Sequence, residues 1–138
     1  MQIAKKTVVL MFVVVLGAIL ANVSAQAQQP SVSVNVPFDF VVGQQTLAAG
    51  VYRMQREGEF VSIRSAEGPA VFALLLAGGT LSTQDGTPYI VFTRYGSEAF
   101  LNSVVFAADQ SYNLSRSSKE KELMSRVSSG EQVAVQMQ

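Results

Sequence analysis

The side chains of this sequence that suit acid–base chemistry are carboxylates, and ten Asp and Glu stand against ten Lys and Arg in 138 residues. A glycoside hydrolase needs only two such groups at a suitable separation. Asp39 is the candidate, because it stands between Phe38 and Phe40 in a predicted strand, where a charge is normally paired. One hypothesis is therefore a small carboxylate-dependent hydrolase that uses Asp39 with another acid. The alternative is a structural ion pair of Asp39 with Arg53 or Arg94, which lie in other predicted strands.

A second motif is Ser118-Lys119-Glu120-Lys121, which has the S-x-x-K spacing. In penicillin-binding proteins and serine β-lactamases this spacing places a serine nucleophile one helical turn from a lysine. Those enzymes also need a buried lysine and a Lys-Thr-Gly strand, and this sequence contains no Lys-Thr-Gly. The motif is instead typical of a capped, solvated helix start in a serine-rich region.

Histidine, cysteine and tryptophan are missing from the composition. This excludes Ser-His-Asp and Cys-His nucleophile systems, disulfides, and the usual nitrogen- or sulfur-ligated metal and haem sites. No segment resembles the calcium-binding pattern D-x-[DN]-x-[DN]-G. The balanced charge argues against a nucleic-acid partner, which requires clustered Lys and Arg. The composition thus predicts a protein that is not an enzyme and has no catalytic, cofactor or metal site.

Aromatic residues give the best indication of a binding site. Tyrosines that face solvent together can form a platform on which a sugar or a peptide stacks. The candidates are Tyr52, Tyr89, Tyr95 and Tyr112. Most phenylalanines lie inside alternating apolar segments, which indicates that they pack in the core.

Residues 1–27 have the form of a secretion signal. Lys5 and Lys6 form a basic start, Thr7 to Val23 is almost wholly apolar, and Ala25-Gln26-Ala27 has the small-x-small form that a signal peptidase accepts. Cleavage after Ala25 or Ala27 would leave a periplasmic or extracellular protein. If the segment is not cleaved, it anchors the protein in a membrane, and no other membrane contact is expected.

The rest of the sequence predicts one β domain. Residues 28–30 form a disordered spacer, 31–129 the domain, and 130–138 a tail that is disordered or adds an edge strand through Val133 and Val135. Seven short segments lie between turn residues, as antiparallel strands do, and most of them alternate polar and apolar residues: 31–36, 38–42, 51–56, 60–64, 70–77, 89–95 and 99–106. They predict an all-β meander that forms a small sandwich or a partly closed barrel, and the sequence does not choose between these.

Two segments carry more specific predictions. Residues 70–77 are apolar on both faces, which favours a central strand that is covered from both sides. Ser117 and Glu120 have the spacing of a capping box, which predicts one short C-terminal helix near 118–128. Because so short a helix is marginal alone, we expect it to dock on the sheet through Leu123 and Val127.

Several motifs of the chain also carry a resemblance. Residues 36–43 (VPFDFVVG) and 47–53 (LAAGVYR) follow the pattern P-F-x-F-x-V-G-x-x-x-L-P-A-G-x-Y, and 91–96 contains F-x-R-Y-G. They are similar to a group of small exported bacterial proteins that is abundant in acidobacterial genomes. Ala48 departs from the group's usual proline, and Ala99 from a common aromatic residue. The resemblance implies a shared fold and no particular activity.

These observations predict a non-catalytic β domain of the periplasm or cell exterior. It would bind another envelope protein through an exposed strand edge, or a carbohydrate through its tyrosines. The carboxylate-dependent hydrolase is the alternative function.

Overall fold

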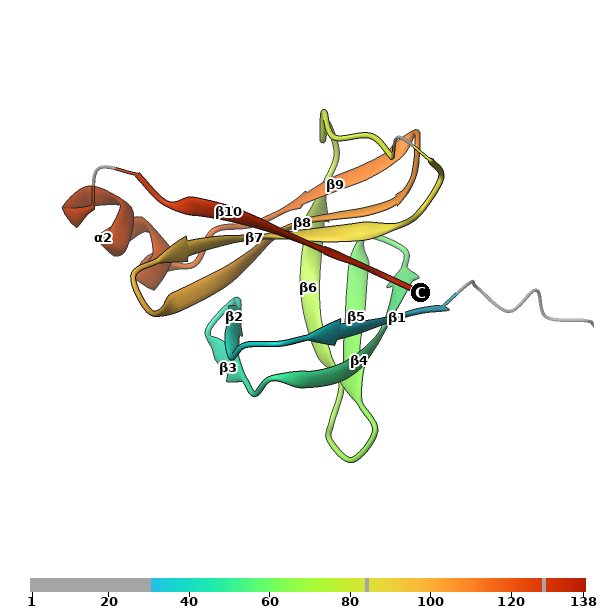
Figure 1. The fold of residues 1–138 in the computed structure, drawn as a ribbon, viewed down its shortest axis with the longest axis horizontal. Helices are drawn as coiled ribbons and strands as arrows, with labels where there is room; N and C mark the ends of the chain where they lie inside the picture. Colours follow the sequence, from blue (N-terminus) through green and yellow to red (C-terminus); the bar gives the residue numbers. More distant parts are fainter. Residues whose placement is uncertain (1–30, 84, 128) are drawn as a thin grey trace, which may run out of the picture.

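A computed structural model describes residues 31–83, 85–127 and 129–138 (Figure 1). The predicted secretion signal, 1–27, and the spacer, 28–30, lie outside the described residues. The fold is all-β with one short helix, as predicted. Its elements are β1 (Ser31–Val36), β2 (Phe40–Val42), β3 (Gln45–Leu47), β4 (Gly50–Glu57), β5 (Phe60–Ser65), β6 (Val71–Leu76), β7 (Tyr89–Tyr95), β8 (Glu98–Ala107), β9 (Gln110–Leu114), α2 (Ser118–Arg126) and β10 (Glu131–Gln136).

The strands form one strongly bent sheet whose two halves cross in Figure 1. One half runs in the order β1-β4-β5-β6, and the other contains β9, β8, β7 and β10. β6 joins the halves, because Val71–Leu74 pair with β5 while Leu75 and Leu76 pair with β9.

The free ends of this sheet meet where β1 contacts the residues that follow β10. Ser33 and Gln138 exchange two backbone hydrogen bonds, with N···O distances of 2.9 and 2.7 Å. Val34 forms an isolated bridge with Met137, which is only 1% exposed. Of the two architectures left open by the sequence, the chain therefore adopts the partly closed barrel.

The predicted meander of seven strands is wrong in its count and in part of its connectivity. Ten strands lie in the described ranges, and neighbours in sequence pair within β4-β5-β6 and β7-β8-β9. β1 pairs with β4 instead, and β10 pairs with β7, so most of the predicted tail is a strand. The hairpin β2–β3 is inserted between β1 and β4, and β2 pairs in parallel with β8 at Val41 and Phe100. The alternation pattern missed β3 and β9 because both are short and mostly polar.

Aromatic rings fill the middle of the barrel. The ring centroid of Phe92 lies 5.0 Å from that of Phe38 and 5.3 Å from that of Phe40, in edge-to-face contact. Tyr52 extends this cluster, 5.2 Å from Phe40. These contacts join β4, β7 and the β2 segment, so the core holds both halves of the sheet together.

Helix α2 begins with the predicted cap and covers a part of the sheet away from the main core. The Ser117 hydroxyl accepts a hydrogen bond from the backbone N–H of Glu120 at 3.2 Å. Leu123 packs as expected, against a second small core made of Val41, Tyr95 and Phe100. The helix ends at Arg126, two residues before the predicted end. Val127 is 39% exposed, so it does not dock the helix as predicted.

Candidate functional site

The four tyrosines expected to form a binding platform lie apart. Tyr52 belongs to the main core and Tyr95 to the small core under α2. Tyr89 begins β7, where its hydroxyl donates to the Ser82 carbonyl at 3.2 Å. Tyr112 on β9 is half-buried beneath the guanidinium of Arg56, which lies 4.8 Å from the ring centroid. The structure therefore does not bring these four rings onto one surface.

The two buried tyrosines have packing roles. The Tyr52 hydroxyl donates to the carbonyl of Ala48 at 2.5 Å, which fixes the loop before β4. Burial raises the pKa of Tyr52 above its ordinary value, and the negative charge of Asp39 raises it further. Burial also raises the pKa of Tyr95, and the negative charge of Glu120 on α2 raises it further. Both phenols are therefore held in their neutral form.

Asp39 does not form the expected ion pair with Arg53 or Arg94. The described residues contain two ion pairs, both of which involve α2, and Asp39 is in neither. Its carboxylate accepts a hydrogen bond from the backbone N–H of Ala49 at 2.9 Å. The physical reason is that Asp39 lies in an exposed bend between β1 and β2, where it closes a loop instead of crossing a strand pair. Arg94 lies over the ring of Phe38, 4.7 Å from its centroid.

The S-x-x-K motif lies on the first turns of α2, with Ser118 and Lys121 both exposed. Over the described ranges, no group of three or more acidic residues is placed to hold a metal ion. No helix in those ranges is long and apolar enough to span a membrane.

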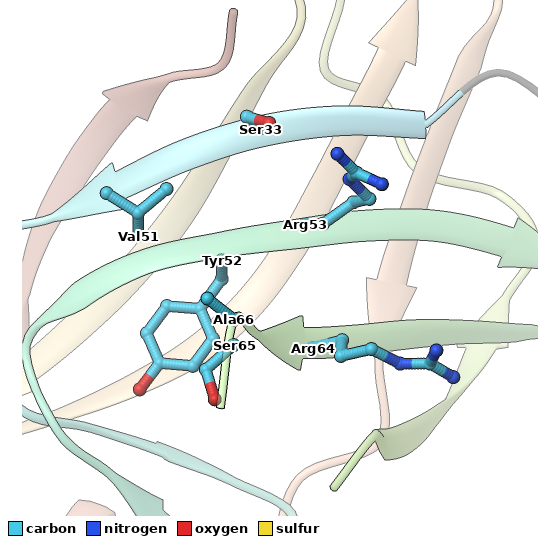
Figure 2. A pocket seen from close by; sticks show the side chains of 7 residues that line it. All are labelled: Ser33, Val51, Tyr52, Arg53, Arg64, Ser65 and Ala66. Atoms are coloured by element: carbon cyan, nitrogen blue, oxygen red, sulfur yellow. The ribbon is translucent and has the colours of Figure 1, made fainter. Parts of the chain in front are cut away.

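Two arginines lie on the neighbouring strands β4 and β5. Arg53 and Arg64 are aligned partners in the strand register, and Ser33 on β1 is aligned with Arg53. Figure 2 shows these three side chains on neighbouring strands, around a shallow depression of about 330 Å³. Both arginines are exposed, and neither takes part in the two ion pairs of the described chain. Like charges repel when they are directly opposite in a sheet, so this location favours an incoming anion.

The outer side of β6 is exposed, so the prediction that residues 70–77 are covered from both sides is wrong. Phe72, Leu74 and Leu76 are 54%, 40% and 42% exposed, and Phe60 on β5 is 45% exposed. The alternate residues of β6 fill the core. The physical reason is that α2 packs on the small core beside β2, β7 and β8, which leaves the outer side of β6 without a covering element.

These apolar side chains and the two arginines belong to one surface, which we call the β4–β6 face. Phe60 is aligned with Leu74, and Ser62 with Phe72. Because side chains alternate along a strand, every second residue of β4, β5 and β6 points to this outer side. The β4–β6 face consists of Arg53, Gln55, Glu57, Phe60, Ser62, Arg64, Phe72, Leu74 and Leu76, of which Ser62 is only 5% exposed.

Sequence reasoning missed the β4–β6 face, although part of the signal was present. Arg53, Gln55 and Glu57 are every second residue of β4 and all three are polar, which indicates that this side of the strand faces outward. In β6 the sequence does not show which side faces outward, since apolar residues occupy both sides of the strand.

A second concave region lies on the outer side of the other half of the barrel. It has a volume of about 480 Å³ and is bordered by amide, hydroxyl and guanidinium groups, among them those of Thr93, Asn102, Asn113, Arg116 and Gln132. The Oδ1 atom of Asn102 is buried without a hydrogen-bond partner. We call this region the polar pocket.

Comparisons of the chain with protein-family models, curated proteins and solved structures found no match. The two surfaces described above therefore carry the functional argument.

Proposed function

We propose that this chain is an exported, non-catalytic domain that binds a protein of the cell envelope through the β4–β6 face. The observation that carries the proposal is the 54% exposure of Phe72 in a patch shared with Phe60, Leu74 and Leu76. Clustered apolar side chains on a small protein mark an association site, because covering them removes apolar surface from water.

The free energy gained by covering these four side chains is large enough to support binding. Complete burial of one Phe or Leu side chain contributes about 1.5–3 kcal/mol relative to full exposure. Four such side chains, each about half exposed, supply a few kcal/mol before the cost of association is subtracted. The nearby charges of Arg53 and Arg64 add selectivity, because an interface discriminates between partners mainly by charge complementarity.

The non-catalytic part of the proposal is supported by the composition and by the position of the acidic candidate. The sequence contains no His or Cys, and the Asp39 carboxylate is engaged by the Ala49 N–H. The exposed position of Ser118 likewise suits a helix cap region better than a nucleophile, which needs a desolvated base beside it.

Export is supported by the signal form of residues 1–27. We expect N-terminal sequencing of the protein from an envelope or periplasmic fraction to begin at Gln26 or Gln28. Recovery of the chain only from the cytosol, with Met1 or Gln2 at its start, would contradict this part of the proposal.

The face itself is tested by photocrosslinking in intact cells. A benzophenone-bearing phenylalanine analogue replaces Phe72, and a matched control carries it at Met124, which is 38% exposed on α2. The proposal expects a discrete covalent adduct with a protein from position 72 and none of the same mass from position 124. Absence of any adduct from position 72, or an identical adduct pattern from both positions, would overturn it.

Carbohydrate binding is the second candidate, and the polar pocket supports it in place of the tyrosines. The hydroxyl of Thr93, the amide nitrogen of Asn113 and the amide of Gln132 border the pocket and offer donors and acceptors that match sugar hydroxyls. A glycan array should then show binding that is lost in Asn113→Ala and retained in Phe72→Ser. An array without a signal would remove this candidate.

A further inference from the structure

The β4–β6 face has an ordered charge pattern along its strands. Glu57 and Glu59 flank Gly58 in the β4–β5 turn and form an acidic end, and all three are exposed. Phe60 and Leu74 are level with Glu57 and so belong to this end, while Phe72 lies in the middle, level with Gln55 and Ser62. Arg53 and Arg64 form a basic end.

The two ends lie at equal distances from a central row. Gln55 is aligned with Ser62, and Ser62 with Phe72. On β4, Glu57 is two residues to one side of this row and Arg53 two residues to the other, so each charge is about 7 Å from the row at 3.3–3.4 Å per residue. A half-turn about an axis along the row therefore exchanges the acidic and basic ends.

We propose that the partner of the β4–β6 face is a second copy of this chain, packed face to face about a two-fold axis along the row Gln55–Ser62–Phe72. This inference rests on the proposed function and names its partner. In this arrangement Glu57 of each copy meets Arg53 of the partner subunit, and Phe72 meets Phe72 of the partner subunit. A two-fold interface of this kind must be self-complementary, and the equal spacing of Glu57 and Arg53 on either side of the row meets that condition.

Within the described part of a single chain, the charged groups of the face form no ion pair. The two ion pairs among the described residues use Lys119, Glu98, Arg126 and Glu122, so the charges at both ends of the face are available. Arg53 also stands opposite Arg64, an alignment that is unfavourable until a carboxylate arrives. In the pair, Phe60 of one copy lies opposite Arg64 of the partner subunit, which suits a cation–π contact.

A second copy fits this pattern better than a simple anion or a wholly acidic protein. Either of those would satisfy Arg53 and Arg64 but would leave Glu57 facing a like charge or no charge. Only a surface that has acidic and basic ends in the opposite order pairs both, and the chain itself supplies one.

The test exchanges the charges at the two ends of the face and measures the dissociation constant of the dimer by sedimentation equilibrium. The protein used begins at residue 28 and so contains every described element. Glu57→Arg and Arg53→Glu are each expected to weaken dimerisation about tenfold or more, because each juxtaposes like charges twice per dimer. The double variant Arg53→Glu with Glu57→Arg restores complementarity, and its dissociation constant should return to within about threefold of the original. Asp109→Arg and Lys121→Glu, which reverse exposed charges away from the face, serve as matched controls and should leave the constant unchanged.

Circular dichroism melts of all five variants establish that each is folded before its association is interpreted. A dimer whose strength does not respond to the single exchanges, or that the double variant fails to restore, would overturn the two-fold pairing. A protein that stays monomeric up to about 1 mM would overturn it as well. If that monomer still gives a position-72 adduct with a different protein, the proposed function stands while the inference of a second copy falls.

Discussion

Asn102 on β8 donates a hydrogen bond from Nδ2 to Oε1 of Glu120 on α2 at a distance of 2.7 Å. Glu120 is only 2% exposed, although it lies in the first turn of a helix whose other described residues are at least partly accessible. The predicted capping box has Glu120 reaching back to the cap residue. The carboxylate instead bonds across to the sheet, so it fastens the helix to the barrel.

Glu120→Ala should lower the free energy of unfolding by about 1.5–3 kcal/mol, because it removes a hydrogen bond to a charged acceptor and leaves Asn102 Nδ2 without a partner. Urea denaturation measures the change. Glu122→Ala is the control, since its ion pair with Arg126 is exposed and should contribute less than about 1 kcal/mol. Equal losses in the two variants would show that Glu120 does not fasten the helix.

Ser117→Ala should destabilise the protein by about 1 kcal/mol, and Ser117→Gly by only a few tenths. The alanine variant loses the acceptor for the Glu120 N–H, whereas glycine leaves that N–H accessible to water. Chemical denaturation of the two variants checks the order. A larger loss for glycine than for alanine would contradict the capping role.

Phe92→Ala should cost about 3–5 kcal/mol, because the ring is 0% exposed and contacts Phe38 and Phe40. Phe72→Ala is the matched control at an exposed position and should change stability by no more than about 0.5 kcal/mol. Thermal unfolding at low protein concentration separates these effects from association. A large loss from Phe72→Ala under those conditions would mean that its ring is buried within a single chain.

Removal of residues 137 and 138 should destabilise the fold by about 2 kcal/mol or more, since it deletes the buried Met137 side chain and the backbone bonds between Ser33 and Gln138. Amide hydrogen exchange should become faster at Ser33 in particular. Unchanged exchange at Ser33 would show that the barrel does not depend on this closure.

Alkaline pH should destabilise the protein through Tyr52 and Tyr95, whose pKa values are raised in the folded state by burial. As pH rises, the unfolded chain loses these protons before the folded chain does. The contribution of the two tyrosines to the free energy of unfolding is therefore complete below their ordinary pKa of 10.0, and it declines as pH rises through the pKa of the folded state. Stability measured from pH 8 upward should fall less steeply in Tyr52→Phe than in the original protein. A parallel pH dependence in both would exclude Tyr52 as the cause.

The fold class and the helix cap could be predicted from the sequence, because alternation and capping depend only on residues that are close together in the chain. Ser31–Val36 and the Ser117 cap are examples. The sequence did not predict that β10 would pair with β7 or that Asp39 would bond to Ala49, since both depend on which distant segments meet. The β4–β6 face was missed for the same reason. An apolar segment such as 70–77 looks identical whether its second side is covered or exposed, and only the position of α2 decides the matter.

The junction of Ser33 with Gln138 bears on how the chain is made. A polypeptide emerges from the ribosome, or crosses a membrane, with its amino end first. Strand β1 cannot gain its closing partner until Met137 and Gln138 have been synthesised and have emerged. Every shorter intermediate therefore leaves one margin of β1 open to pairing with other chains. The sheet therefore cannot close before Gln138 has emerged, and until then the nascent chain needs protection from aggregation.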